Sequence, residues 1–357
     1  MDSATRCVIG VDLGGTKTAA GIVDAAGTLH AAYSRPTPAT AGAAAILATA
    51  VGLIASLLAQ ARDAGLEPVA VGIGAAGVID ARDGSVVSAT DSLTGWAGTP
   101  LAAYLAAQSG LPAFAVNDVH AHNLGEHWLG ASAGAASSLL VAVGTGVGGS
   151  LIVAGEPQLG ARAVAGHVGH IASPYAYDDA GRALPCSCGR AGHVEAVASG
   201  PAILDLYRRL SGGDAVSARD VASRAAAGEP SALRAFSLGA AAAGQAVGGL
   251  ANVLDPAMVV IGGGVTAAGD LWWGPFEAAL RAELMDPLAG LAVVPAVLGS
   301  NAAVVGAAKL AFDRLALDRL ALGGGAPSGD TPSVPDAPSA RVAPNATDPF
   351  VQENSHA

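Results

Sequence analysis

Apolar runs separated by glycine-rich turns dominate the amino-terminal part of the chain. Residues 7–32, CVIGVDLGGTKTAAGIVDAAGTLHAA, contain three apolar runs, with a glycine-rich turn after the first and a D-A-A-G turn after the second. Apolar runs of this length between turn residues predict β-strands, here an antiparallel meander. Residues 138–161, SLLVAVGTGVGGSLIVAGEPQLGA, repeat the plan. An internal repeat of this kind predicts a duplicated lobe.

The remaining pattern predicts an α/β protein. Residues 155–198 have no clear period, and residues 321–357 are rich in Pro, Gly, Ser and Ala, so we expect a disordered tail there. The uncharged run 235–254 could span a bilayer by length, but Ala and Gly dominate it, so we expect a buried, closely packed helix. Strands are expected at 69–80, 113–118 and 257–264, and helices near 41–64, 99–109, 200–210, 217–227, 231–254, 270–285 and 301–320.

Composition narrows the function classes. A length of 357 residues suits two domains, and the 18 basic against 29 acidic residues give a net charge of -11 without a basic cluster. Nucleic acid and anionic membranes are therefore not expected partners. The amino terminus has no signal-peptide pattern and the chain has three cysteines, so we expect a cytoplasmic protein without a disulfide framework.

The glycine-rich turns fail the familiar nucleotide templates. GTGVGG at 144–149 and GIGAAG at 72–77 match G-x-G-x-x-G, but a dinucleotide site needs that motif to open a helix, and here further strands are expected. GVDLGGTK at 10–17 lacks the Gly-Lys-Ser/Thr of a P-loop. Two hairpins remain, whose backbone N–H groups and Thr16 and Thr145 hydroxyls can bind phosphate. The alternative is glycine used only for turn geometry.

Four motifs together carry a resemblance. VIGVDLGGTKTAAGIVD, VNDVHAHNLGEHWLG, VAVGTGVGGSLIVAGEPQLGARAVAGHVGH and CSCGRAGHVEAVASG resemble, in order and spacing, those of the ROK family of bacterial sugar kinases and sugar-responsive repressors, over residues 7–312. The resemblance implies a two-lobed actin-like ATPase (ribonuclease H-like) fold with a cleft for ATP and sugar. The lobes would be residues 1–117, joined by helix 301–320, and residues 118–300. ROK repressors add an amino-terminal helix-turn-helix domain, and this chain begins six residues before its first strand, which favours a kinase.

The resemblance also implies roles for single residues. Asp118 would be the general base that phosphoryl transfer to an alcohol needs, although capping the next helix is the other role open to it. Asp12 would orient Mg²⁺. The phosphates of ATP would contact Gly14, Gly15, Thr16, Lys17, Gly144, Thr145 and Gly146, and its adenosine Gly262, Gly263 and Gly264. The sugar would contact Gly77, Asn117, Asp118, His167, His170 and Glu195.

Two cysteines one residue apart suggest a metal site. Cys186, Cys188 and His193, with His170 upstream, are ligand types that tetrahedral Zn²⁺ accepts, although spacing alone leaves a pair of free thiols open. The ROK pattern here is Cys-x-Cys-Gly-x-x-Gly-Cys-x-Glu, and His193 stands in place of its third cysteine. The resemblance thus implies a structural Cys₂His₂ zinc site that holds Glu195 and residues 167–170 at the sugar hydroxyls.

The resemblance implies an ATP-dependent hexose kinase that phosphorylates the sugar 6-hydroxyl, and we expect a homodimer. His167 stands where the family usually has a glutamate, and some N-acetylmannosamine kinases of the family have a similar Ala-Gly-His-x-Gly-His. N-acetylmannosamine is therefore the expected substrate and glucose the alternative. A sugar sensor without catalytic activity is the alternative from another class.

Overall fold

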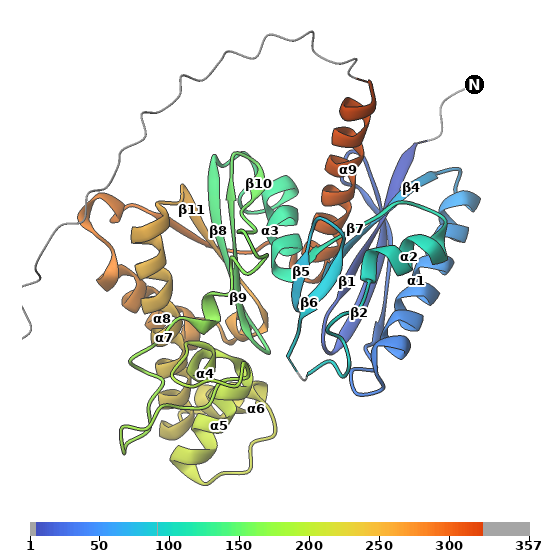
Figure 1. Cartoon of the computed structure of the whole chain (residues 1–357). Helices are drawn as coiled ribbons and strands as arrows, with labels where there is room; N and C mark the ends of the chain where they lie inside the picture. Colours follow the sequence, from blue (N-terminus) through green and yellow to red (C-terminus); the bar gives the residue numbers. More distant parts are fainter. Residues whose placement is uncertain (1–4, 91, 324–357) are drawn as a thin grey trace, which may run out of the picture. The chain divides into compact units, whose positions relative to one another are not determined.

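The computed structural model describes residues 5–90 and 92–323, which contain two five-stranded sheets (Figure 1). In the first sheet the order is β3-β2-β1-β4-β7. The first three strands form the antiparallel meander, and β4 and β7 join parallel to β1. The strands are β1 (Arg6–Leu13), β2 (Lys17–Asp24), β3 (Leu29–Pro36), β4 (Glu67–Ala75) and β7 (Ala113–Asn117).

The second sheet repeats this topology. Its order is β10-β9-β8-β11-β12, again an antiparallel meander followed by two parallel strands. The predictions of a repeated meander and of a duplicated α/β architecture are confirmed. Both sheets belong to one compact unit ending at Leu317, and the boundary predicted between residues 117 and 118 stays a prediction. The strands are β8 (Ser137–Val143), β9 (Val147–Val153), β10 (Glu156–Pro157), β11 (Met258–Gly262) and β12 (Ala292–Pro295).

The other predicted strands and helices follow the prediction, with two differences. The strand predicted over 69–80 ends at Ala75 and resumes as β5 (Val78–Asp80), which pairs with β6 (Ser85–Ser88). The last helix reaches Gly323, so residues 321–323 are helical and not part of a tail. Residues 324–357, the rest of the predicted tail, lie outside the described residues. The helices are α1 (Ala43–Asp63), α2 (Leu101–Ser109), α3 (Asp118–Leu129), α4 (Glu195–Ala198), α5 (Gly200–Ser211), α6 (Ala218–Ala226), α7 (Pro230–Leu254), α8 (Asp270–Glu283) and α9 (Ala302–Gly323).

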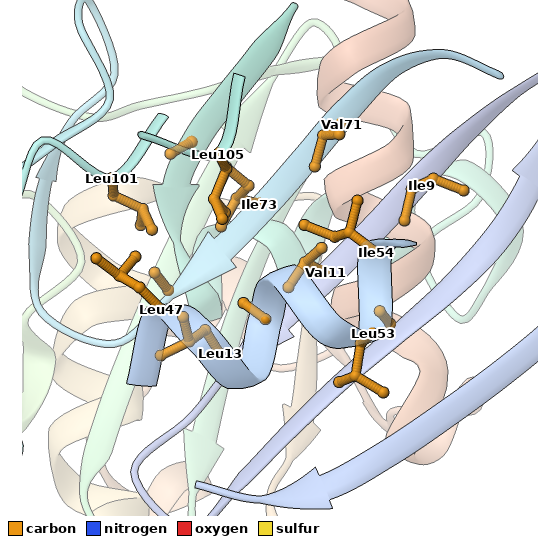
Figure 2. Close-up of a cluster of buried hydrophobic side chains, with 14 of the residues drawn as sticks. Ile9, Val11, Leu13, Leu47, Leu53, Ile54, Val71, Ile73, Leu101 and Leu105 are labelled. Carbon is orange, nitrogen blue, oxygen red and sulfur yellow. The ribbon is translucent and has the colours of Figure 1, made fainter. Parts of the chain in front are cut away.

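A hydrophobic core forms where α1 and α2 cover the first sheet (Figure 2). Within the described residues, α1 is the one helix long and apolar enough to cross a membrane, judged by length and composition. A core helix meets the same criterion, and the buried side of α1 packs on the sheet. The core side chains labelled in Figure 2 are Ile9, Val11, Leu13, Leu47, Leu53, Ile54, Val71, Ile73, Leu101 and Leu105.

Glycines allow close contacts between helices and strands. A Cβ on Gly244 would lie 2.1 Å from the Phe276 carbonyl oxygen of α8, and one on Gly248 2.6 Å from the Leu280 carbonyl oxygen. The prediction that residues 235–254 form a closely packed helix is therefore confirmed. In the same way α9 contacts the first sheet, because a Cβ on Gly72 would lie 1.8 Å from the Ala307 carbonyl oxygen.

Candidate active site

The carboxyl ends of three parallel strands gather the acidic residues. Register pairs Asp12 of β1 with Gly74 of β4, and Ala75 of β4 with Asn117 of β7. Parallel strands end at the same edge of a sheet, so these residues lie at one edge. Helix α3 begins directly after Asn117, whose side-chain oxygen accepts from Val119 N–H at 2.9 Å as the N-cap. Its amide nitrogen donates to the Gly77 carbonyl oxygen at 2.9 Å, which fixes the turn after β4.

Asp118 lies half-buried in the first turn of α3. Burial raises the pKa of its carboxyl group, while hydrogen bonds such as that from Val119 N–H, 2.9 Å away, oppose the rise. Burial, and then the charge of Asp118, raise the pKa of Asp12 to about 7, with Lys17 opposing the rise. Asn117 and Asp118 both accept a hydrogen bond from Val119 N–H, so Asn117 can cap α3 without Asp118. The two carboxylates are close enough to disfavour each other's ionised form.

A cavity of ≈ 300 Å³ opens beside Asp118. Most of the residues that border it come from the ends of β4 and β7, from the starts of α3 and α4, from the 144–146 turn and the start of β9, and from the 166–170 segment. A small cavity walled by carboxylate, amide and imidazole groups suits a polar ligand rich in hydroxyl groups. All the residues predicted to contact the sugar border this cavity: Gly77, Asn117, Asp118, His167, His170 and Glu195.

A larger cavity of ≈ 960 Å³ meets the first at the 144–146 turn. Gly144 and Thr145 border both cavities, Thr16 and Gly264 border the larger one, and Gly146 and Gly263 border the smaller one. The other predicted nucleotide contacts, Asp12, Gly14, Gly15, Lys17 and Gly262, border neither.

The sequence did not predict the apolar wall of the larger cavity. Helical residues with the spacing of ordinary core positions form this wall, so no local pattern in the sequence distinguished them from core residues. It includes Pro201, Leu204, Ala222, Phe236, Val265, Ala267 and Ala268.

His167 presents a defined nitrogen to the smaller cavity. Its Nδ1 lies 3.1 Å from the Val164 carbonyl oxygen. A carbonyl can only accept, so Nδ1 carries the hydrogen, and Nε2 of the neutral ring is left as an acceptor. His167 can therefore accept a hydrogen bond from a ligand hydroxyl at the position where a carboxylate would do the same.

Glu195 links two parts of the site, the 144–147 turn and the loop that carries Cys186 and Cys188. One carboxylate oxygen accepts from Val147 N–H at 2.8 Å, and the other accepts from the Ser187 hydroxyl. A Cβ on Gly146 would lie 2.7 Å from the first oxygen, so a larger residue there would push the carboxylate away from Val147. Glu195 thereby joins the 144–147 turn to the cysteine loop. Ser187, which the sequence analysis did not single out, lies between the two cysteines of that loop.

The two cysteines and two histidines gather into one cluster. The ligand atoms of His170, Cys186, Cys188 and His193 all lie within 4.8 Å of one another. Sγ of Cys186 is 3.5 Å from Nδ1 of His170, and Sγ of Cys188 is 3.3 Å from Nδ1 of His193. A tetrahedral zinc ion with ordinary Zn–S and Zn–N distances separates S and N ligands by about 3.5 Å. Burial lowers the pKa of His170, which favours the neutral imidazole that binds metals. The donor set fits zinc.

These features define a class of protein. Duplicated sheets, two cavities that meet at a glycine-rich turn, and a half-buried carboxylate with a raised pKa beside the smaller cavity fit an actin-like ATPase fold that transfers phosphate. The model of the ROK family matches residues 8–314, and the chain belongs to that family.

Known proteins of high similarity agree with this assignment. Glucokinase of Streptomyces coelicolor is 34% identical over 327 residues, which cover 85% of this chain and 96% of the relative. N-acetylmannosamine kinase of Shigella boydii is 32% identical over 263 residues, or 73% of this chain and 84% of the relative. The ROK glucokinase of Streptomyces griseus, solved with glucose and AMPPNP, is 32% identical with a TM-score of 0.72, covering 85% of this chain and 98% of that one. The two-lobed actin-like fold expected from the sequence is confirmed.

Proposed function

We propose that this protein transfers the γ-phosphate of ATP to the 6-hydroxyl of N-acetylmannosamine. Its family and its glucokinase and N-acetylmannosamine kinase relatives make it an ATP-dependent hexose kinase. The particular sugar, the hydroxyl and the residue roles are the proposal. A cytoplasmic location and a homodimer stay predictions from the sequence.

The meeting of the two cavities at the 144–146 turn supports this function best. Gly144 and Thr145 border both, so a nucleotide in the larger cavity would place its terminal phosphate against a sugar in the smaller one. Asp118 borders the sugar side, and its raised pKa makes it a stronger base than an ordinary aspartate. It accepts the proton of the attacking hydroxyl as that oxygen bonds to phosphorus.

The nucleotide side has the groups that the donor needs. Thr16 and Thr145 offer hydroxyls to phosphate oxygens, and the apolar wall around Leu204 and Phe236 accommodates the base. Asp12 lies within the electrostatic range of Asp118 and Lys17 at the strand edge. Its carboxylate would hold Mg²⁺ or the waters of that ion, and the ion would offset negative charge on the phosphates.

We further propose that the cluster of His170, Cys186, Cys188 and His193 binds one structural zinc ion. His170 borders the sugar cavity, and Glu195 contacts Ser187 between the two cysteines. A metal in the cluster would therefore hold His170 and Glu195 in place at the sugar. Groups that do not touch a ligand themselves often orient the residues that do.

Metal analysis of the purified protein is expected to find about one zinc per chain. Cys186→Ser and Cys188→Ser should lose the metal and raise the sugar KM before nucleotide binding suffers, because the ligands lie on the sugar side. Cys7→Ala is the matched control, since Cys7 is buried in β1 outside the cluster and should keep the metal. Zinc-free protein with unchanged sugar KM would refute the proposal.

The sugar preference is expected to follow His167. A carboxylate offers only acceptors, whereas this imidazole offers Nε2 alone, because Nδ1 already donates to the Val164 carbonyl. Loss of one pairing with a sugar hydroxyl changes discrimination strongly. We expect kcat/KM to favour N-acetylmannosamine in the wild type and to shift toward glucose, by roughly tenfold or more, in His167→Glu.

Glucose is the second candidate, because the glucokinase relative is more similar over a longer stretch than the N-acetylmannosamine kinase relative. Comparison of kcat/KM for both sugars decides between them. A wild type that prefers glucose, and keeps that preference in His167→Glu, would overturn the assignment of His167.

A further inference from the structure

His120 lies two residues, or about half a helical turn, after the proposed base Asp118 and does not border the cavity. It is 2% exposed on α3. Its Nδ1 is 2.9 Å from the hydroxyl of Ser150 on β9, and its Nε2 is 3.1 Å from the Ala165 carbonyl oxygen. Both ring nitrogens are thus engaged inside the protein, and one reaches the segment that carries His167.

The direction of each hydrogen bond follows from the chemistry. The Ala165 carbonyl only accepts, so Nε2 of His120 carries the hydrogen and Nδ1 accepts from the Ser150 hydroxyl. Asn123 donates to the carbonyl of Ser150 at 2.8 Å and accepts from the hydroxyl of Ser138 at 3.2 Å. Asn123, Ser138 and Ser150 are each fully buried. The network fixes both the tautomer and the orientation of the His120 ring.

Residues 164–167, here called the reader segment, are held from two sides. Gly166 accepts from Gly149 N–H at 2.7 Å, and its φ of 91° with a Cβ position only 2.2 Å from the Gly149 carbonyl oxygen requires glycine. His120 binds the preceding carbonyl, that of Ala165. Within the described part of the chain, His120 is the only side chain from outside the segment with a hydrogen bond to the segment's backbone.

We propose that His120 is a positioning residue that sets the distance between the sugar-reading His167 and the base Asp118. Helix α3 carries both Asp118 and His120, so the bond from His120 to Ala165 connects the base-bearing helix directly to the reader segment. The inference rests on the role proposed for His167. It adds that His120 aligns two parts of the sugar: the hydroxyl that donates to Nε2 of His167 and the attacking hydroxyl beside Asp118.

The surroundings keep this connection in one form. Burial lowers the pKa of His120 to about 4, so the ring stays neutral near neutral pH and Nδ1 remains an acceptor for Ser150. An apolar replacement would leave the Ala165 carbonyl and the Ser150 hydroxyl without this partner, and a buried polar group without a partner is costly. The reader segment would then shift to find other partners.

The test compares His120→Leu with the conservative His120→Gln, whose side chain keeps an N–H donor and an acceptor at similar reach. His120→Leu is expected to raise the sugar KM about tenfold and to lower kcat, while the KM for ATP changes less than about twofold. His120→Gln should restore most of the sugar affinity. If His120→Leu does not fold, His120→Asn, which is too short to reach both partners, replaces it with the same expectation.

A double-mutant cycle with His167→Ala identifies the route of the effect. If His120 acts through His167, the increase in sugar KM caused by His120→Leu should largely disappear in the His167→Ala background. Ser138→Ala is the control, because it also removes a buried hydrogen bond of the network but lies at the end far from the reader segment. It should lower the melting temperature without moving the sugar KM.

Three results would overturn the role of His120: additive effects in the cycle, equal changes in the KM for sugar and for ATP, or an unchanged sugar KM in His120→Leu. An increase in sugar KM in Ser138→Ala equal to that in His120→Leu would do the same, since it would indicate general destabilisation. His167→Ala with unchanged sugar KM would instead overturn the role proposed for His167.

Discussion

Asp118→Asn is expected to lower kcat by about 10²- to 10⁴-fold, because the amide cannot accept the proton of the attacking hydroxyl. The amide keeps the shape of the carboxylate and can still accept the hydrogen bond from Val119 N–H, so α3 should begin in the same way. Sugar binding, measured by calorimetry without nucleotide, should change far less than kcat. A coupled assay of ADP release under saturating substrates measures the rate.

Asp63→Asn is the matched control, since Asp63 is an exposed aspartate at the end of α1 and makes no contribution to either cavity. It should leave kcat unchanged. Activity of Asp118→Asn near that of the wild type would show that another group, or water alone, takes the proton.

Most of the fold could be predicted because the pattern is local. Each meander consists of apolar runs joined by turns rich in glycine, and the order of the runs already defines antiparallel neighbours. Strand β12 was missed since its four residues, AVVP, are strand only through pairing with β11. The division of the predicted 69–80 strand was missed because the turn after Ala75, in which Gly77 has a φ of 107°, is held by a hydrogen bond from Asn117, 40 positions away.

The site was predictable where its residues follow strand ends or lie within short motifs. Asp12 and Asn117 lie at the ends of apolar strands and Asp118 directly follows one, while the close spacing of Cys186 and Cys188 marks the cysteine loop. The role of His120 could not be predicted, since a histidine within a helix resembles a surface residue until Ala165, 45 positions away, lies next to it. The apolar wall of the nucleotide cavity could not be predicted either, because Leu204 and Phe236 have the spacing of ordinary core residues.

Asp12→Asn is expected to lower kcat by about 10²- to 10³-fold, because it removes the carboxylate that we propose to hold Mg²⁺ near the charge that develops on the phosphate. A second effect concerns pH. The pKa of Asp12 is raised to about 7, so the proton and Mg²⁺ compete for one carboxylate near neutral pH. Below this pKa the affinity for Mg·AMPPNP should fall by about tenfold per pH unit, since one proton must leave for the metal to bind.

Calorimetry of Mg·AMPPNP binding at pH 6, 7 and 8 measures this dependence, and Asp12→Asn corrects for protonation of the nucleotide itself. The ratio of the wild-type affinity to that of Asp12→Asn should be largest at pH 8 and about tenfold smaller at pH 6, where about a tenth of the Asp12 carboxyl groups are ionised. Asp118→Asn makes a sharper test, because the charge of Asp118 is one cause of the raised pKa of Asp12. With that charge gone, the pH at which the affinity falls should move down. A pH dependence that is the same in all three proteins would mean that Asp12 does not hold the metal.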